Sequence, residues 1–313
     1  MIATDQIKMM GTIIDLYIDS PKAKQQAATI RELLTLYNHR FSANDDSSEL
    51  MAINHMAGIQ PVRVHSDLFD LISIGKEHSL ACPSNLNIAL GPLVQSWRIG
   101  FSDAKLPAEA TIGHKLRLTN PNHIILNQSL GSIFLKEKGM SIDLGALAKG
   151  YIADKLMAFL IKDGITAALI NLGGNVLVHG TNKQRHNGLF YVGIQQPNQK
   201  RGQHIGVIKV NNSSVVTSGI NERQLRIEDK TYHHLLDPHT GYPIKTNMAS
   251  LTIVSQSSLD GELWSSRLFG LEHSFVLNQL NKLPEVEGII ITKDGQVTIS
   301  DGLQEAFRLH YKH

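Results

Sequence analysis

Apolar residues along this chain switch between a period of two and a period of three to four, without a regular rhythm. Residues 11–19 alternate between apolar and polar like a half-buried strand. A helix is predicted next, because Ser20 can serve as its cap and Pro21 suits a first turn. The apolar residues that recur at helical spacing are Ala23, Ala27, Ile30, Leu34 and Tyr37.

Similar patterns predict the later elements. The predicted helices are a short one through Asn54 after the loop 41–50, one from a Ser66 cap, one from Gly145 to about Leu160, and one over about 259–270. The predicted strands are 123–127, 132–139, a short one at 141–143, two within 165–180 joined by a glycine pair, three over 188–197, 204–210 and 213–218, a hairpin at 224–236, a strand at 248–255, and a last hairpin around 293–296.

This mixture of elements indicates an α+β fold with mixed, largely antiparallel sheets and packed helices. A doubly wound fold is not favoured, because the strands and helices do not follow a βαβ rhythm. No repeat, linker or low-complexity segment divides the sequence. We therefore expect one domain, residues 1–313, with two lobes.

The charge balance narrows the classes of partner. Thirty basic and 28 acidic side chains give a net charge of +2, without a long run of one sign, so we expect no nucleic-acid partner. No window approaches the roughly 18 apolar residues that span a bilayer, so we expect no membrane insertion. Cys82 is the only cysteine, which excludes an internal disulfide. Without a recognisable signal at the N-terminus, we expect a cytoplasmic protein.

The segment 141–156, SIDLGALAKGYIADKL, combines a predicted strand, a turn at Gly145 and a helix start. Lys149 and Gly150 fall in the first turns of that helix, where free N–H groups collect. A phosphate would suit this position, because the helix dipole and the lysine both favour negative charge. A surface lysine on an ordinary helix is the simpler reading of the segment alone. Neither a P-loop nor a GxGxxG signature is present.

Two further glycine clusters have similar ambiguity. Gly173 and Gly174 can form a tight turn between strands, or they can let the backbone approach a ligand. Ser218 and Gly219 end a predicted strand, where a hydroxyl can cap a turn or contact a ligand.

Two segments carry groups suited to catalysis or metal binding. In residues 233–243, HHLLDPHTGYP, turn formers such as Asp237 are explained by a turn alone, but His234 can serve as a base at neutral pH. Glu262 and Ser266 lie four residues apart on one face of the predicted helix 259–270. Their oxygens could hold a hard cation such as Mg²⁺, although a solvated glutamate beside a serine is the simpler reading.

The order of these segments resembles the ApbE family, the FAD:protein FMN transferases. The resemblance covers about residues 10–307. The matching segments are MGT at 10–12, FSANDDSSEL at 41–50 followed by Asn54, GPLVQSW at 91–97, DLGALAKGY at 143–151, NLGGN at 171–175, TSG at 217–219, HHLLDPHTGYP at 233–243, and the helix with Glu262 and Ser266.

This resemblance implies an activity and a set of ligands. Members bind FAD in a cleft of an α+β fold, use magnesium, and transfer the FMN half to a threonine or serine hydroxyl of a target flavoprotein, which releases AMP. FAD is thus implied as the substrate, Mg²⁺ as the cofactor, and a flavoprotein with an acceptor hydroxyl as the partner.

The resemblance also implies roles for individual residues. His234 and Asp237 match the family's HxxDPxTG pattern and are the implied catalytic residues. The implied metal ligands are the Ala148 carbonyl, Glu262 and Ser266. The residues implied to bind FAD are Met10, Glu49, Lys149, Gly173, Gly174, Ser218 and Gly219.

Four positions depart from the family's usual residues. Glu262 and Ser266 stand where Asp and Thr are usual, Asn175 replaces an acid after NLGG, and Asn87 replaces an Asp before GPLV. These departures keep open the alternative of an FAD-binding protein without catalysis. A second alternative is a pyrophosphatase, in which water replaces the protein hydroxyl and FAD is split into FMN and AMP.

Overall fold

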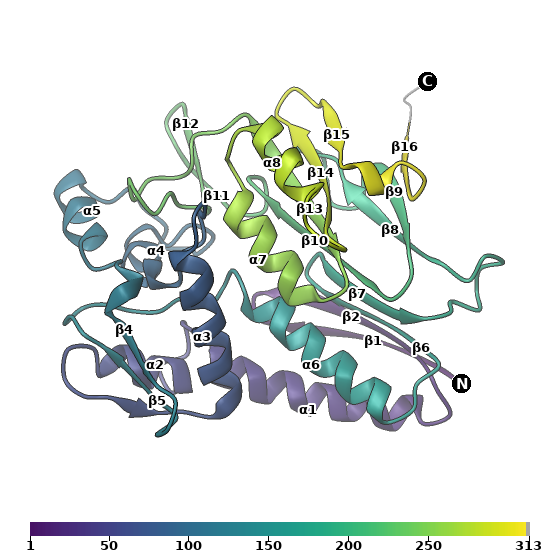
Figure 1. The fold of residues 1–313 in the computed structure, drawn as a ribbon, viewed down its shortest axis with the longest axis horizontal. Helices are drawn as coiled ribbons and strands as arrows, with labels where there is room; N and C mark the ends of the chain where they lie inside the picture. Colours follow the sequence, from purple (N-terminus) through teal and green to yellow (C-terminus); the bar gives the residue numbers. More distant parts are fainter. Residues whose placement is uncertain (311–313) are drawn as a thin grey trace.

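A computed structural model of the chain describes residues 1–310, so the last three residues of the predicted domain 1–313 lie outside the described residues. The predicted α+β fold is confirmed, because helices pack against sheets whose strand pairs are antiparallel (Figure 1).

The largest sheet has eight strands in the order β1-β2-β6-β7-β10-β13-β14-β15. The bounds of these strands are β1 Ile2–Met9, β2 Thr12–Asp19, β6 Ala167–Leu172, β7 Asn175–Gly180, β10 Ser213–Gly219, β13 Met248–Ser255, β14 Glu287–Thr292 and β15 Val297–Ile299. Strands far apart in the sequence thus become neighbours. Because β2 pairs with β6, the β1–β2 turn at 10–11 and the β6–β7 turn at 173–174 lie at the same end of the sheet.

Strand β6 shows how both faces of this sheet are buried. Ala168, Ile170 and Leu172 belong to a core cluster shared with the helices, while Ala167 and Leu169 pack in a cluster with the strands on the opposite face. Because side chains alternate along a strand, a nearly continuous apolar run such as this one fits a sheet that is covered on both sides.

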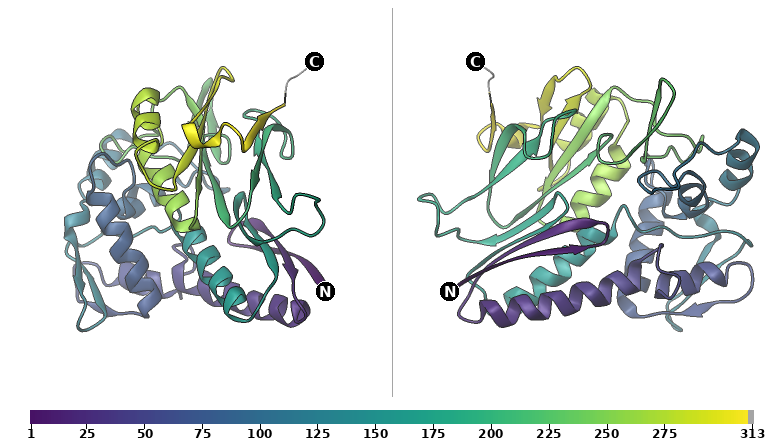
Figure 2. Two further views of the ribbon diagram at one scale, coloured as in Figure 1. Left: turned by 45° about the vertical axis from the view of Figure 1, so that its right-hand side comes forward. Right: turned by 180° about the vertical axis from the view of Figure 1, so that it is seen from behind.

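Helices α1 Ala23–Phe41, α6 Ala148–Lys162 and α7 Ser258–Leu268 cover one face of the large sheet (Figure 1). The other face is covered by a three-stranded sheet in the order β16-β9-β8, formed by Phe307–Leu309, His204–Val210 and Phe190–Gln195 (Figure 2). Helix α8, His273–Leu280, packs beside β13 and β14.

A smaller part lies beside the large sheet (Figure 1). It contains the short sheet β3-β5-β4 and four helices. Their bounds are α2 Glu49–His55, β3 Val62–Arg63, α3 Ser66–Leu80, α4 Gly91–Trp97, α5 Glu109–Leu116, β4 Ile124–Asn127 and β5 Ser132–Leu135. The largest apolar cluster includes residues of both parts, from Ile7 through Leu71 to Leu263, so the two share one core.

The predicted hairpin at 224–236 is present as β11 Gln224–Ile227 and β12 Lys230–His233. Its Tyr232 packs against Trp97, which is buried at the end of α4 and donates a hydrogen bond from Nε1 to the Gly241 carbonyl at 2.9 Å. The hairpin and the turn that follows it are therefore fixed against the smaller part.

The predicted strand 141–143 is wrong. Residues 141–144 are extended but join no sheet. Instead, the Asn54 side chain takes the place of a neighbouring strand: its Oδ1 accepts from Ile142 N–H at 2.8 Å and its Nδ2 donates to the Ile142 carbonyl at 3.0 Å. A side-chain amide from a distant helix leaves no trace in the local pattern.

Several helix starts also differ from the prediction by one to three residues. Helix α1 begins at Ala23 after Lys22, and the Ser20 hydroxyl accepts the Lys22 N–H without serving as the cap. Helix α3 is capped by the side chain of His65, one residue before the predicted Ser66 cap. Helix α6 begins at Ala148, three residues after Gly145.

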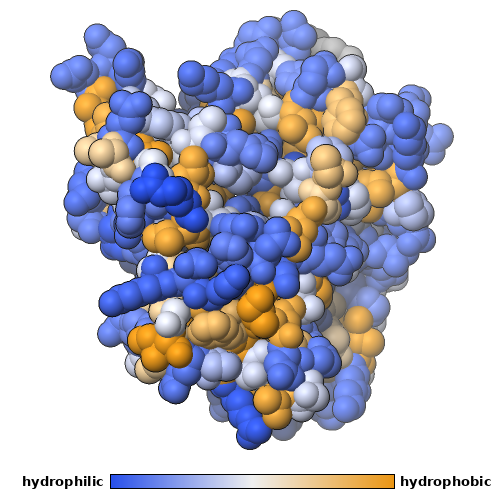
Figure 3. Space-filling view, turned by 60° about the vertical axis from the view of Figure 1, so that its left-hand side comes forward, coloured by the Kyte–Doolittle hydropathy of each residue, from blue (hydrophilic) through white to orange (hydrophobic). Residues whose placement is uncertain are grey.

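Within residues 1–310, no helix has the length and apolar character that crossing a bilayer requires. Figure 3 shows a face in which hydrophilic residues separate scattered apolar ones. Exposed apolar side chains of the smaller part include Ile59, Leu80, Leu106, Ile125 and Leu130.

Candidate functional site

The start of α6 meets the middle of α7 through an ion pair. The Lys149 ammonium lies 3.3 Å from Oε1 of Glu262, whose side chain is almost fully buried. The Asn175 amide, at the start of β7, donates a hydrogen bond to the same oxygen at 2.9 Å. Three segments predicted from separate motifs are thus brought together.

Two features hold α6 and α7 in this arrangement. Gly150 is required by the close approach, because a Cβ there would lie 2.5 Å from the Ser258 carbonyl oxygen and 2.8 Å from Cγ of Glu262. The Asp154 carboxylate accepts the N–H groups of Ser258 and Leu259 at 2.7 and 2.9 Å. An acid on α6 therefore satisfies free donors at the start of α7.

Ser218 also reaches α7, since its hydroxyl donates to the Ser265 hydroxyl at 3.0 Å. Ser218 and Gly219 end β10, next to β13. Ser266 is half-buried and lies one helical turn beyond Glu262, which places the two side chains on one face of α7.

The glycine pair forms the β6–β7 turn, as predicted, with φ of +70° at Gly173 and +104° at Gly174. A Cβ on Gly173 would lie 2.1 Å from Oγ1 of Thr12, so this turn touches the turn at the end of β1. Met10 in that second turn has a φ of +54°. Both turns adopt left-handed conformations that favour glycine.

His234 lies directly after β12, and its Nδ1–H donates to the Arg223 carbonyl at 3.4 Å. A carbonyl can only accept, so Nε2 is left with the free lone pair. Burial lowers the pKa of His234 to about 4, and the positive charges of Arg223 and Lys149 act in the same direction. His234 is therefore neutral near pH 7 and able to take a proton.

Asp237 is used by its own turn. Its Oδ1 accepts the His239 N–H at 2.7 Å, and its backbone pairs with Tyr242 and Gly241. Within residues 1–310, its carboxylate makes no hydrogen bond with His234. The structure thus gives Asp237 a role in shaping the turn after His234.

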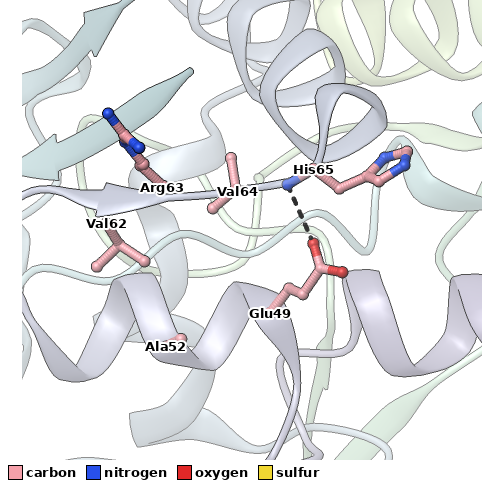
Figure 4. A pocket seen from close by; sticks show the side chains of 6 residues that line it. All are labelled: Glu49, Ala52, Val62, Arg63, Val64 and His65. Carbon is pink, nitrogen blue, oxygen red and sulfur yellow. Dashed lines mark hydrogen bonds between the residues drawn. The ribbon is translucent and has the colours of Figure 1, made fainter. Parts of the chain in front are cut away.

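Glu49 lies apart from the Lys149–Glu262 pair, in a separate shallow pocket of about 220 Å³ between α2 and β3 (Figure 4). Its carboxylate accepts from the buried Arg40 guanidinium at 3.1 Å and from the His65 N–H at 3.4 Å. Arg40 also binds Asp67. These contacts give Glu49 a structural role in the smaller part.

Sequence reasoning did not assign two residues of this region, Arg223 and Asp143, and it did not predict the contact between Asn175 and Glu262. Burial raises the pKa of Asp143, against the effects of the Gly145 N–H and the Arg223 charge. Asp143 stands in the DLGALAKGY segment, whose composition could have marked it. Arg223 lies between two recognised motifs, and nothing in its local sequence distinguishes it.

The oxygens near Glu262 suit a hard cation. Its Oε1 holds Lys149 and Asn175, whereas its Oε2 makes no hydrogen bond or ion pair among residues 1–310. Ala148 is the first residue of α6, and the turn 145–147 before it exposes Gly145 and Ala146. A carboxylate, a hydroxyl and a backbone carbonyl are ligands that Mg²⁺ accepts together with water. Residues 1–310 contain no group of three His, Cys, Asp or Glu side chains that could hold a metal ion.

Comparison with known sequences shows the family to which the chain is related. Residues 10–290 match the profile of the ApbE family. An FAD:protein FMN transferase of Klebsiella pneumoniae is 39% identical over 274 residues, which cover 88% of this chain and 84% of that protein. A second one, of Treponema pallidum, is 32% identical over 319 residues, which cover 96% of this chain and 87% of that protein.

Two solved structures share the fold. The ApbE protein from Thermotoga maritima superposes with a TM-score of 0.89 at 22% identity, covering 98% of this chain and all of that one. The flavin transferase ApbE from Vibrio cholerae gives a TM-score of 0.82 at 21% identity, covering 97% of this chain and 98% of that one. At this level of identity the two structures support the fold alone.

Proposed function

The chain belongs to the ApbE family, and from this premise we propose that it is an FAD:protein FMN transferase. The observation that carries the proposal is the meeting of Lys149, Asn175 and Glu262. It gathers three motifs of the family at one helix start, where a diphosphate can be bound.

The reaction exchanges the phosphoanhydride bond of FAD for a phosphate ester bond. The hydroxyl oxygen of a threonine or serine on a target flavoprotein forms a bond to the phosphorus of the FMN half. The bond between that phosphorus and the bridging oxygen breaks, and AMP leaves with the bridging oxygen. The hydroxyl proton goes to a base, so no oxidant or reductant is needed.

His234 is the proposed base. Its Nδ1–H is engaged with the Arg223 carbonyl, so Nε2 is the atom that would accept the proton. Asp237 supports it by shaping the turn that follows. The neutral state of His234 near pH 7, set by burial and by the neighbouring positive charges that lower its pKa, fits this role.

The remaining residues bind FAD and the metal. Glu262, Ser266 and the Ala148 backbone carbonyl would hold Mg²⁺, which would neutralise charge on the phosphates. We propose that Lys149 faces the diphosphate and that the turns with Met10, Gly173 and Gly174 and the strand end with Ser218 and Gly219 line the FAD. Glu49 is not part of this proposed site, because its carboxylate is held by Arg40 and His65.

Incubation of the protein with FAD, Mg²⁺ and a flavin-acceptor domain, followed by intact mass analysis, tests the proposal. We expect the acceptor to gain the mass of FMN, and we expect this gain to disappear with EDTA and in Glu262→Ala. The matched control is Asp260→Asn, which removes an acid from the first turn of the same helix.

Two other results would contradict transfer. Free FMN and AMP with an unmodified acceptor would indicate a pyrophosphatase. FAD that stays bound without turnover would indicate a binding protein, which the departures at Asn175 and Glu262 keep open.

A further inference from the structure

Arg223 lies beside the candidate base without being part of a recognised motif. It directly precedes β11, four residues after Gly219, and its side chain is exposed. Its carbonyl accepts the hydrogen bond from Nδ1 of His234. Its backbone is therefore fixed at the same place as the imidazole.

One glycine leaves room for the Arg223 side chain, and a second lies within contact distance of it. A Cβ on Gly100 would lie 2.6 Å from Cδ of Arg223, and a Cβ on Gly11 would lie 3.7 Å from its Nη2. Both glycines have a positive φ, +96° and +69°. The aliphatic part of the arginine thus passes the segment after α4, and its guanidinium lies at the β1–β2 turn next to Met10.

The guanidinium has no internal partner. Among residues 1–310 it makes no hydrogen bond and no ion pair, whereas the Lys149 ammonium is engaged with Glu262. Its charge is nevertheless felt on both sides, because it lowers the pKa of His234 and opposes the burial that raises the pKa of Asp143. The charge of the guanidinium therefore acts on both the candidate base and an acid of the DLGALAKGY segment.

We propose that Arg223 binds the diphosphate of FAD through its guanidinium. This inference rests on the proposed function, since it places the arginine on the substrate of that same site. A diphosphate carries two negative charges, and the planar guanidinium can donate two parallel hydrogen bonds to phosphate oxygens. Its location beside His234 would hold the reacting phosphate near Nε2.

The test measures FAD affinity by the quenching of flavin fluorescence, without any acceptor protein. Arg223→Met keeps the aliphatic stem between Gly11 and Gly100 and removes only the charge. We expect it to raise the dissociation constant of FAD by about tenfold or more, as for a lost hydrogen bond between charged groups. We expect Arg223→Lys to recover at least part of that loss, because it restores the charge.

Arg226→Met is the matched control, because Arg226 is exposed on the same hairpin. We expect its FAD affinity to equal that of the unchanged protein. Equal affinity in Arg223→Met would overturn the inference. Equal losses of FAD affinity in Arg223→Met and Arg226→Met would indicate a general effect of net charge, and would also overturn it.

This experiment separates the inference from the proposed function. If FAD affinity depends on Arg223 but no acceptor gains FMN, the arginine is a phosphate-binding residue of a protein that is not a transferase. If acceptors gain FMN while FAD affinity is unchanged in Arg223→Met, the proposed function stands and the inference fails.

Discussion

His234 owes its proposed chemistry to its surroundings. A free histidine is half protonated near pH 6.5, whereas burial, with Arg223, His233 and Lys149 nearby, lowers the pKa of this one to about 4. The base form therefore exists over the whole range from about pH 5 upward. The sequence motif identifies the histidine, but its protonation state depends on the surroundings that the fold provides.

We predict that His234→Ala slows FMN transfer by about 10²–10⁴-fold, as expected for the loss of a general base, while FAD affinity changes much less. In the unchanged enzyme, the base form is lost only as the pH falls toward 4, so the rate should show no histidine-like decrease between pH 8 and 6. Single-turnover rates and FAD titrations give the two quantities. Equal losses in rate and affinity would argue against a base.

Asn175 and Glu262 show what the sequence predicted at individual positions and what it could not. Each was recognised as a departure from the family's usual residue, but their contact at 2.9 Å became visible only in the structure. An acid at position 175 would place a second negative charge against Glu262, whereas the amide donates a hydrogen bond to it. The two departures are therefore physically compatible with each other.

Glu49 shows the opposite case. Its segment matches the family, yet its carboxylate serves a buried arginine away from the Lys149–Glu262 pair. A motif includes residues that hold the fold as well as residues that bind ligands, and a single sequence does not separate them.

Helices α6 and α7 determine the distance between Lys149 and Glu262. Their close approach depends on Gly150, which has no room for a side chain. The pairing of these helices could not be deduced from periodicity, because each helix is amphipathic by itself. Local patterns predicted both helices, whereas their approach was implied only by the resemblance, which assigns Ala148 and Glu262 to one metal site.

We predict that Gly150→Ala destabilises the protein by about 1–3 kcal/mol, because the new methyl group would overlap the Ser258 carbonyl and the Glu262 side chain. Transfer activity should fall as well. Gly113→Ala is the matched control in helix α5, where a Cβ meets nothing within 4 Å. It should leave stability unchanged or raise it by up to about 1 kcal/mol. Urea unfolding measures both, and equal effects would refute the packing argument.

Asp154 makes the stability of this helix pair depend on pH. Burial raises its pKa to about 6 from an ordinary value of 3.8. Below about pH 4 the carboxyl is protonated in both the folded and unfolded protein, so the raised pKa has no effect. Between pH 4 and 6 it ionises more readily in the unfolded chain, which lowers the free energy of unfolding as the pH rises.

We therefore predict that the stability difference between the unchanged protein and Asp154→Asn becomes smaller as the pH rises from about 4 to 6, by on the order of 2 kcal/mol, and is constant above that range. Asp163→Asn serves as a control at the C-terminal end of the same helix, where hydrogen bonds from Gln26 and Lys22 lower the pKa of the carboxyl. Denaturant titrations at several pH values provide the measurement. A difference for Asp154→Asn that does not vary with pH would contradict the prediction.

The local patterns predicted most strands and helices of the molecule, since the β6–β7 turn, the hairpin β11–β12 and the last hairpin β14–β15 follow from turn residues between apolar runs. The strand order could not be predicted in the same way. The proposed site draws on segments from the β1–β2 turn at position 10 to α7 at position 266. The pairing of β2 with β6 and of β10 with β7 and β13 arranges the strands that carry several of these segments.

A ligand that spans these segments should stabilise the whole chain. We predict that FAD with Mg²⁺, at about 100 times its dissociation constant, raises the free energy of unfolding by about 2.7 kcal/mol, because it binds the folded state alone. EDTA should remove most of this gain. Thermal unfolding measures this gain with FAD alone, with Mg²⁺ alone and with both. Equal stabilisation by FAD with and without Mg²⁺ would mean that the metal does not support FAD binding.

The fluorescence of the buried Trp97 indole should report on the binding of a flavin. Trp97 donates a hydrogen bond to the Gly241 carbonyl and packs against Tyr232 and Tyr242. These contacts lie on either side of His234 and Asp237 in the sequence. The emission of Trp97 should be blue-shifted, and a flavin held near His234 and Asp237 should quench it by energy transfer. The chain has two tryptophans, so replacing Trp264 by phenylalanine would leave Trp97 as the single fluorescent reporter of FAD binding.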